Sequence, residues 1–236
     1  MSRLIPSQLA ARADAAIAEA EELSRTQSIN TPIFVCAASF PDMPTPLFIF
    51  EPRYRLMIER AWHGNRLFGM VLPNLGTDEG LGNVHFNRHG TMLYIETLHL
   101  QEDGRSHLFC RGTSRFIINE WGWKDEYLVA STKRISDIPP SMEENMEMRR
   151  VAAGAPSTRA LMEEAFEFAQ YWAVGLHPGA MAAYGEPPRN ERTLAYWLAV
   201  ILPIARRNQY QMIKAQSVRE RLEIAVGWTR TMERNW

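Results

Sequence analysis

The sequence predicts an α+β protein in which a β-rich first part is followed by a helical second part. Between Pro32 and about Ile135, short runs rich in Val, Ile, Thr, Tyr and Phe alternate with turn residues, a pattern typical of strands. Beyond Ile138-Pro139-Pro140, apolar residues recur at the spacing of a helix instead. The 236 residues are 46% hydrophobic and 22% charged, a balance typical of folded globular proteins.

Six apolar runs predict the strands of the first part: PIFVCAAS, RLFGMVLP, TMLYIETLHL, HLFCRG, RFIINEW and YLVAST. Several short strands within about a hundred residues indicate a small barrel that is closed or nearly closed, because closure removes exposed strand edges. Asp103-Gly104 lies between two of these runs and predicts a hairpin turn. The segment from Gly76 to Gly90 contains four glycines and predicts a long mobile insertion.

One helix is expected to interrupt the β-rich part. Pro52 suits the first turn of a helix, where its missing N–H costs no hydrogen bond, and Gly64 suits the end. Between them, apolar residues follow at helical spacing: Tyr54, Met57, Ile58, Ala61 and Trp62. We expect this apolar face to pack on the strands.

The second part predicts a helical bundle. A first apolar stripe consists of Leu161, Ala165, Phe168, Ala169 and Trp172, a second of Leu194, Trp197, Leu198, Ile201 and Leu202, and a third of Val218, Leu222, Ala225 and Val226. Ser217 and Glu220 predict a capping box at the start of the last helix. The expected division is an extension at 1–30 with a short helix capped by Ser7, the β-rich domain at 31–140 and the bundle at 141–236.

Composition narrows the class of function. The 26 basic and 27 acidic side chains give a formal net charge of -1, which does not favour nucleic acid as a partner. The two cysteines, Cys36 and Cys110, are too few for a disulfide framework or a four-cysteine zinc site, so a reducing intracellular location is expected, in the cytoplasm or the nucleus. The longest apolar stretch, Leu194 to Ile204, is too short to span a membrane.

The order of motifs resembles the LON N-terminal domain, the substrate-binding domain of Lon proteases, which also occurs in cereblon and in LON-domain RING-finger proteins. The resemblance begins in the segment from Phe40 to Leu72, with Leu47-Phe48-Ile49-Phe50-Glu51-Pro52-Arg53-Tyr54 and Phe68-Gly69-Met70. It continues through Asp103-Gly104-Arg105, Gly112, Arg115-Phe116 and Tyr127-Leu128-Val129-Ala130, then LAYWLAVILPI and SVRERLE. The sequence of these motifs is most similar to that of the eukaryotic RING-associated branch of the family.

This resemblance implies a PUA-like β-barrel with an inserted helix, followed by an α-helical bundle. It also implies a non-catalytic module that recognises unfolded or degron-bearing protein clients for degradation, with a RING domain and a ubiquitin-conjugating enzyme as partners outside this sequence. The sequence itself shows no phosphate-binding loop and no setting for a Ser-Lys dyad, and its cysteines are too few for a RING. We therefore expect no enzymatic activity and no cofactor. The start at Met1 is compatible with a piece of a longer protein.

Four aromatic residues are candidates for client contacts: Trp121, Trp123, Phe48 and Phe50. The tryptophans, on either side of Gly122 in an expected turn, are equally compatible with a plug at the barrel end or at the domain junction. The remaining signature residues are expected to act mainly in the structure, as does Phe50: Glu51, Pro52, Arg53, Tyr54, Phe68, Gly69, Asp103, Gly104 and Arg105. Glu51 is expected either to favour the helix start or to pair with an arginine.

Three alternatives remain open on the sequence alone. A PUA-like barrel can bind RNA, although the near-neutral charge opposes this function. A stand-alone LON-domain protein of bacterial type is the second alternative. The third is a small hydrolase that uses Cys36 or Cys110 with a histidine, but both cysteines lie in apolar runs typical of core packing. His85 and His89 lie in the expected solvated loop, so no metal site is predicted there.

Overall fold

The computed structural model describes residues 29–74, 76 and 84–234. The predicted helix capped by Ser7 lies outside these residues. The strands are β1 (Thr31–Val35), β2 (Pro44–Ile49), β3 (Leu67–Pro73), β4 (Phe86–Leu100), β5 (Ser106–Lys124) and β6 (Tyr127–Ile135). The helices are α2 (Pro52–His63), α3 (Pro140–Ala152), α4 (Thr158–Val174), α5 (Pro178–Tyr184), α6 (Glu191–Ile201), α7 (Arg206–Lys214) and α8 (Val218–Arg234). The α+β class and the change from strands to helices near Pro140 are as predicted.

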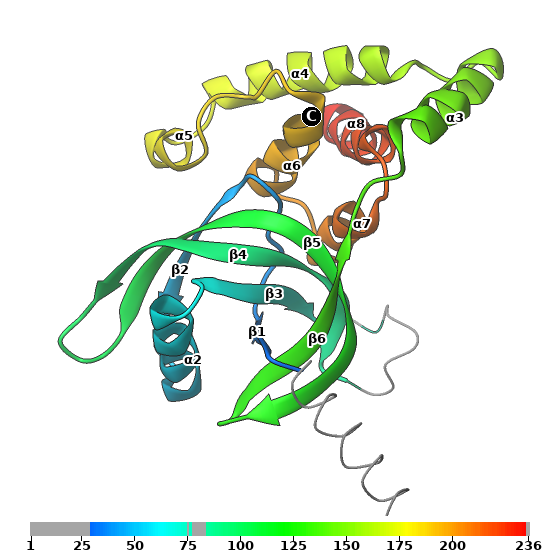
Figure 1. Cartoon of the computed structure of the whole chain (residues 1–236). Coiled ribbons are helices and arrows are strands. Elements are labelled where there is room, and N and C mark those ends of the chain that lie inside the picture. Colours follow the sequence, from blue (N-terminus) through cyan, green and yellow to red (C-terminus); the bar gives the residue numbers. More distant parts are fainter. Residues whose placement is uncertain (1–28, 75, 77–83, 235–236) are drawn as a thin grey trace, which may run out of the picture.

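The strands form one sheet that closes on itself. Its order is β2-β5-β4-β3-β1-β6, and β6 pairs with β5 as well as with β1. The β1–β3 pairing is parallel, and the other pairings between strands are antiparallel. The strand β2 pairs with β5 alone among the described strands, so it lies at an edge. Figure 1 shows α2 beside the strands and the helices α3 to α8 together at one end of the sheet.

Several strand predictions were wrong in their limits, and one strand was missed. The runs HLFCRG and RFIINEW are one continuous strand, β5, because Gly112 is a strand residue and not a turn. A Cβ atom on Gly112 would lie 2.0 Å from the carbonyl oxygen of Phe40, so glycine is needed where the chain at 40–43 crosses β5. Strand β4 begins at Phe86, inside the expected mobile insertion, and strand β2 was not predicted as a strand.

The helix α2 begins and ends where the sequence predicts, with Pro52 in its first turn and Gly64 as its C-cap. Its apolar stripe, Tyr54, Met57, Ile58 and Ala61, is buried in the same hydrophobic cluster as Phe68 of β3 and Leu93 of β4. The helix therefore covers one side of the sheet, as expected. Burial of these side chains stabilises the position of the chain on either side of α2.

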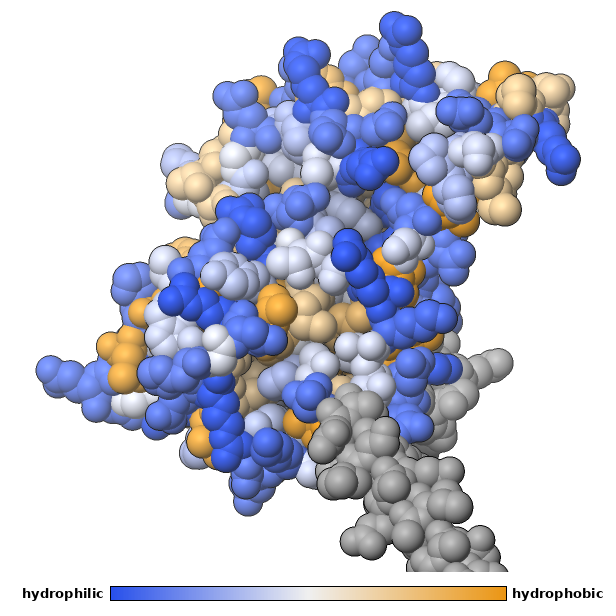
Figure 2. Space-filling model, viewed as in Figure 1, coloured by the Kyte–Doolittle hydropathy of each residue, from blue (hydrophilic) through white to orange (hydrophobic). Residues whose placement is uncertain are grey.

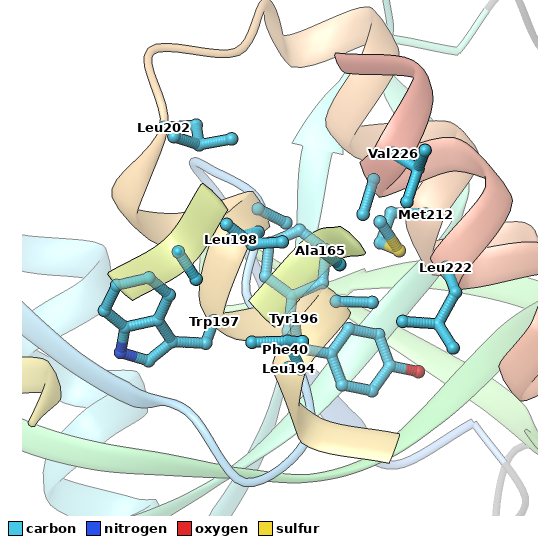
Figure 3. Close-up of a cluster of buried hydrophobic side chains, with 14 of the residues drawn as sticks. Phe40, Ala165, Leu194, Tyr196, Trp197, Leu198, Leu202, Met212, Leu222 and Val226 are labelled. Atoms are coloured by element: carbon cyan, nitrogen blue, oxygen red, sulfur yellow. The ribbon is translucent and has the colours of Figure 1, made fainter. Parts of the chain in front are cut away.

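A second hydrophobic core fills the helical region. Trp197 and Leu198 of α6 are buried against α4 and α8, which carry the other two predicted stripes. Figure 3 shows these side chains converging from several helices, together with Phe40 from the β-rich part. The Phe40 ring stacks on Tyr196, with centroids 5.5 Å apart. The stripes are thus buried, apart from Trp172 and Ile201, which are half-buried.

The capping box of α8 differs in one bond from the prediction. The Ser217 hydroxyl accepts a hydrogen bond from the Glu220 N–H at 3.0 Å, as expected. The Glu220 carboxylate accepts from the N–H of Gln216 at 2.8 Å, one residue before the cap. In the part of the chain that the structure describes, no helix has both the length and the apolar character needed to cross a bilayer.

Candidate interaction surface

Strand β2, the first half of β5 and the end of β4 form a three-stranded wing, made of residues 44–49, 106–111 and 97–100 (Figure 1). Leu108 of β5 lies between Leu47 of β2 and Leu98 of β4 in the register. These three side chains belong to the hydrophobic cluster that contains Met57 and Ile58 of α2. The inner face of the wing is therefore covered by the core.

The outer face of the wing carries aromatic rings instead. His107 of β5 lies between Phe48 of β2 and His99 of β4, and the Phe48 and His107 ring centroids are 4.7 Å apart. Phe109 is two residues further along β5, and its ring lies 6.4 Å from the His99 ring. Phe48 and Phe109 are 41% and 51% exposed. We name Phe48, His99, His107 and Phe109 the outer aromatic face.

Phe50 and Arg105 extend this surface at its margin. Phe50, directly after β2, is 56% exposed, and its ring centroid is 6.2 Å from that of Phe48. The guanidinium carbon of Arg105 lies 5.6 Å from the Phe48 ring centroid, within the range of a cation–π contact. In Figure 2, apolar side chains appear among hydrophilic ones near the protruding β4–β5 hairpin. The outer aromatic face thus has a further exposed ring and a cation at its margin.

The outer aromatic face departs from the usual pattern of a half-exposed sheet. An antiparallel sheet with one solvated face normally places apolar residues inward and polar residues outward. In β5, Leu108 and Cys110 point inward, yet Phe109 points outward, opposite Pro46 of β2. Contiguous exposed apolar surface in a folded protein is typical of an interaction site. This face is therefore the candidate functional site.

The signature residues hold this wing in place. Arg55 of α2 donates one hydrogen bond to the carbonyl oxygen of Phe50 at 2.8 Å and another to that of Asp103 at 3.0 Å. Gly104 has a φ of +79°, and a Cβ atom there would lie 3.0 Å from the Arg55 guanidinium. Arg105 pairs with Asp103 at 2.5 Å. Two signature segments that are distant in the sequence therefore meet at the hairpin end of the wing.

The other signature residues lie in the core or at the start of α2. Glu51 occupies the N-cap position without a side-chain capping bond, and it pairs with Arg53 at 2.9 Å. Phe68 is fully buried, and Tyr54 packs edge-on against Phe34. A Cβ atom on Gly69 would lie 2.7 Å from both Ile33 and Phe116, so only glycine fits there without movement. These contacts support the structural role expected of the signature.

Trp121 and Trp123 were predicted to lie in a turn, but they lie in strand β5. The turn follows at Asp125 and Glu126, which both have positive φ angles. Trp123 stacks on His85, with ring centroids 5.6 Å apart, and Trp121 meets Phe86 edge-on at the same distance. The two tryptophans are 53% and 36% exposed, so each is shared between solvent and contacts within the chain.

The four predicted contact residues therefore form two separate surfaces. Phe109, which shares a face with Phe48, lies near the start of β5, and Trp121 lies near its end. At ~3.3 Å per residue, Phe109 and Trp121 are about 40 Å apart along the strand. Phe48 and Phe50 were found from the sequence. His99, His107 and Phe109 were missed, because only the register with β2 and β4 shows which face they share with Phe48.

The surroundings of His89, Cys36 and Cys110 do not favour a catalytic role for these residues. His89 lies in β4 and not in a solvated loop, and its Nδ1 is 2.9 Å from the Tyr210 hydroxyl. Burial raises the pKa of Cys110 to about 12, and the charge of Glu96 adds to this shift. Burial also raises the pKa of Cys36. Both thiols are therefore neutral near pH 7, when they are poor nucleophiles.

The fold and surface define a mixed α+β domain with an exposed aromatic face. Residues 30–230 match the family model of the ATP-dependent protease La (LON) substrate-binding domain. The chain belongs to this family, whose substrate-binding domain is non-catalytic. The resemblance stated from the sequence is thereby confirmed.

Curated relatives place the domain in two settings. The chain is 24% identical to a LON peptidase N-terminal domain and RING finger protein of Schizosaccharomyces pombe, over 91% of the chain and 48% of that protein. It is 30% identical to a Lon protease of Desulfosudis oleivorans over 42% of the chain and 12% of the protease. The chain therefore spans about half or less of these relatives.

Two solved structures share the fold. The Lon N-terminal domain protein from Xanthomonas campestris has a TM-score of 0.55 at 18% identity, covering 84% of this chain and 97% of that one. The N-terminal domain of the Mycobacterium avium complex Lon protease has a TM-score of 0.58 at 16% identity, covering 85% and 97%. These similarities support a common architecture.

Proposed function

We propose that this chain is a client-recognition module that binds unfolded or degron-bearing protein segments through the outer aromatic face. Membership of the substrate-binding family supports the general function. The observation that carries the specific site is the exposure of Phe48 and Phe109 on a wing whose other face is already covered by the core, with the exposed Phe50 at its margin. These rings are not part of that core, so a partner can cover their exposed apolar surface.

The chemistry of the face favours apolar client segments. Aromatic side chains give large contact areas at low cost in conformational entropy, and they are frequent among the residues that dominate binding energy. Arg105 at the margin adds a site for an acidic residue or a backbone carbonyl of the client. The prolines at positions 44 and 46 of β2 lack N–H donors, which disfavours the addition of a client strand at this edge. We therefore propose contact through side chains.

The setting of the domain is a further part of the proposal. The S. pombe relative is named for a RING finger, and RING domains recruit ubiquitin-conjugating enzymes. We propose that this chain selects clients for such a ligase, with the zinc-bearing part on another segment or chain, and that its sheet is a PUA-like barrel. Co-purification of the chain with a ubiquitin-conjugating activity from its host would support this setting. Its absence, with clients still bound, would favour a stand-alone LON-domain protein.

The test of client binding uses a permanently unfolded model protein. Carboxymethylated, reduced α-lactalbumin is titrated against the full chain, and binding is measured by fluorescence anisotropy. The change Phe48→Ser with Phe109→Ser is expected to weaken binding at least tenfold, because two rings no longer contact the client. The matched control is Val174→Ser, which removes an 88% exposed apolar side chain from the end of α4.

Two results of this experiment would contradict the proposal. One is unchanged binding by the Phe48 and Phe109 variant, particularly if Trp121→Ala with Trp123→Ala abolishes it, which would move the client site to the other end of β5. The other is binding of structured RNA, and not of the unfolded protein, with a steep dependence on salt concentration. That result would establish the RNA-binding alternative.

A further inference from the structure

A second candidate site lies where the sheet meets the helices. A groove of about 480 Å³ runs between the end of β6, the start of α3, α6 and α8. Its lining includes four arginines: Arg115, Arg134, Arg192 and Arg221. This groove shares no residue with the outer aromatic face. Any function of the groove is therefore independent of the proposal made for that face.

Two of these arginines are buried around a single carboxylate. Arg221 binds Asp137 with both terminal nitrogens, at 2.7 and 2.6 Å, and Arg115 binds the same carboxylate at 2.6 Å. The side chains of Arg115 and Arg221 are 4% and 2% exposed. One negative charge thus faces two guanidinium groups, which leaves this cluster with one positive charge in excess. The buried Nε of Arg221 has no hydrogen-bond partner within the described residues.

The other two arginines are exposed, and their guanidinium groups have no partner among the described residues. Arg134 of β6 and Arg192 of α6 line the same groove, and neither guanidinium group has a hydrogen bond or ion pair with a described residue. One comes from the sheet and the other from the helices. A guanidinium group presents a fork of N–H donors that matches the two oxygens of a carboxylate. The groove thus has free donors above a buried positive cluster.

Acidic residues in the same groove limit the charge of the ligand. Asp42 and Glu143 also line it, so four arginines and three acidic residues, Asp137 included, give the groove a formal net charge of only about +1. One negative charge on a ligand would balance this excess, whereas further negative charges would also face the carboxylates. A ligand with one carboxylate and neighbouring N–H donors suits both kinds of residue in the groove. Its carboxylate oxygens would contact the arginines, and its N–H groups would donate to the acidic side chains.

We propose that this groove binds the C-terminal carboxylate of a polypeptide. The carboxylate lies between Arg134 and Arg192, and the preceding peptide N–H groups face Asp42 and Glu143. The volume accommodates a few residues at the end of a chain. Tyr196 is also part of the groove lining, and its ring centroid lies 5.1 Å from the guanidinium carbon of Arg221, within the range of a cation–π contact.

The test compares free acids with amides. A mixture of random octapeptides, prepared with a free C-terminal carboxylate or a C-terminal amide, is passed over the immobilised full chain, and the retained peptides are quantified by mass spectrometry. The expected result is at least tenfold enrichment of the acids, lost in the double change Arg134→Gln with Arg192→Gln. Lys133→Gln is the matched control, because it removes a positive charge from the neighbouring residue of β6, which does not line the groove.

Equal retention of acids and amides would overturn the proposal. Displacement of the acids by inorganic phosphate at equal concentration would also overturn it, since the groove would then be a general anion site. The Phe48→Ser variant distinguishes this proposal from the previous one. Retained acid selectivity in that variant, with weakened binding of the unfolded protein, would support two separate sites.

Discussion

Aromatic residues are buried in the helical region and exposed on the wing. Trp197 and Tyr196 of α6 are 1% and 4% exposed, and they pack within one core with α4 and α8. Phe48 and Phe109 are 41% and 51% exposed, although the strands that carry them are well packed on their other side. Both regions are rich in aromatic residues, but only the helical region uses them for its own stability.

This difference indicates what each set of rings contributes. A buried ring stabilises the fold through the apolar area that it removes from water. An exposed ring gives this stabilisation only when a partner covers it and removes its apolar area from water. The two regions should therefore respond in opposite ways to truncation: loss of stability with the first, and loss of binding with the second.

The largest expected effect is on the helical core. Trp197→Ala should lower the free energy of unfolding by about 3–5 kcal/mol, because it leaves a cavity among Leu194, Leu198 and their neighbours. It also removes the hydrogen bond from the indole N–H to the Gly185 carbonyl. Urea denaturation measures the change. Tyr171→Ala, at a 67% exposed position of α4, is the control and should change it by less than about 0.5 kcal/mol.

A smaller effect is expected at the junction between the sheet and the helices. Asp137→Asn should cost about 3 kcal/mol, because Arg115 and Arg221 are buried and lose their shared counter-charge. Glu96→Gln breaks the exposed pair with Arg111 and should cost less than about 1 kcal/mol. Similar losses in the two variants would show that the buried pair does not tie the two regions together.

The same carboxylate predicts a dependence of stability on pH. Burial alone would raise the pKa of Asp137, but hydrogen bonds and the charges of Arg221 and Arg115 lower it overall. Its stabilising contribution is therefore fully present above the unfolded-state pKa of about 4 and is lost as the pH falls through the lower folded-state pKa. Denaturation curves below pH 4 should show this loss in the native chain and not in Asp137→Asn. Parallel curves for both proteins would contradict the assignment.

The smallest effect on stability is expected on the wing. Phe109→Ser should change the free energy of unfolding by less than about 1 kcal/mol, because the ring is half exposed and lies beside the exposed ring of His99. Thermal denaturation, with Leu108→Ser as the buried neighbour, checks this difference. A loss at Phe109 as large as at Leu108 would mean that the ring belongs to the core, and the contrast between the two regions would fail.

Local patterns explain why much of the fold could be predicted. The limits of α2 follow from Pro52 and Gly64, and the stripe of α6 follows from helical spacing, so both depend on neighbouring residues alone. The limits of β5 depend on a contact made far along the chain. Gly112 is required by the crossing at Phe40, and a glycine in an isolated sequence reads equally well as a turn.

The candidate site could be predicted only in part for a similar reason. Phe48 and Phe50 were identified because they lie in the signature segment. In the run of β5 from His107 to Cys110, inward and outward positions are both apolar or aromatic, so the alternation that normally separates two faces is weak. The pairing with β2 and β4 assigns His107 and Phe109 to the outer face, and that pairing is a tertiary property.

Hydrogen exchange of the full chain with and without the unfolded model protein tests the central claim most directly. The account predicts that binding slows exchange in peptides that cover β2 and the first half of β5, residues 44–50 and 105–111, with little change in the helices α4 and α6. Protection confined to residues 118–124 near Trp121 and Trp123, or to the helical region, would contradict it.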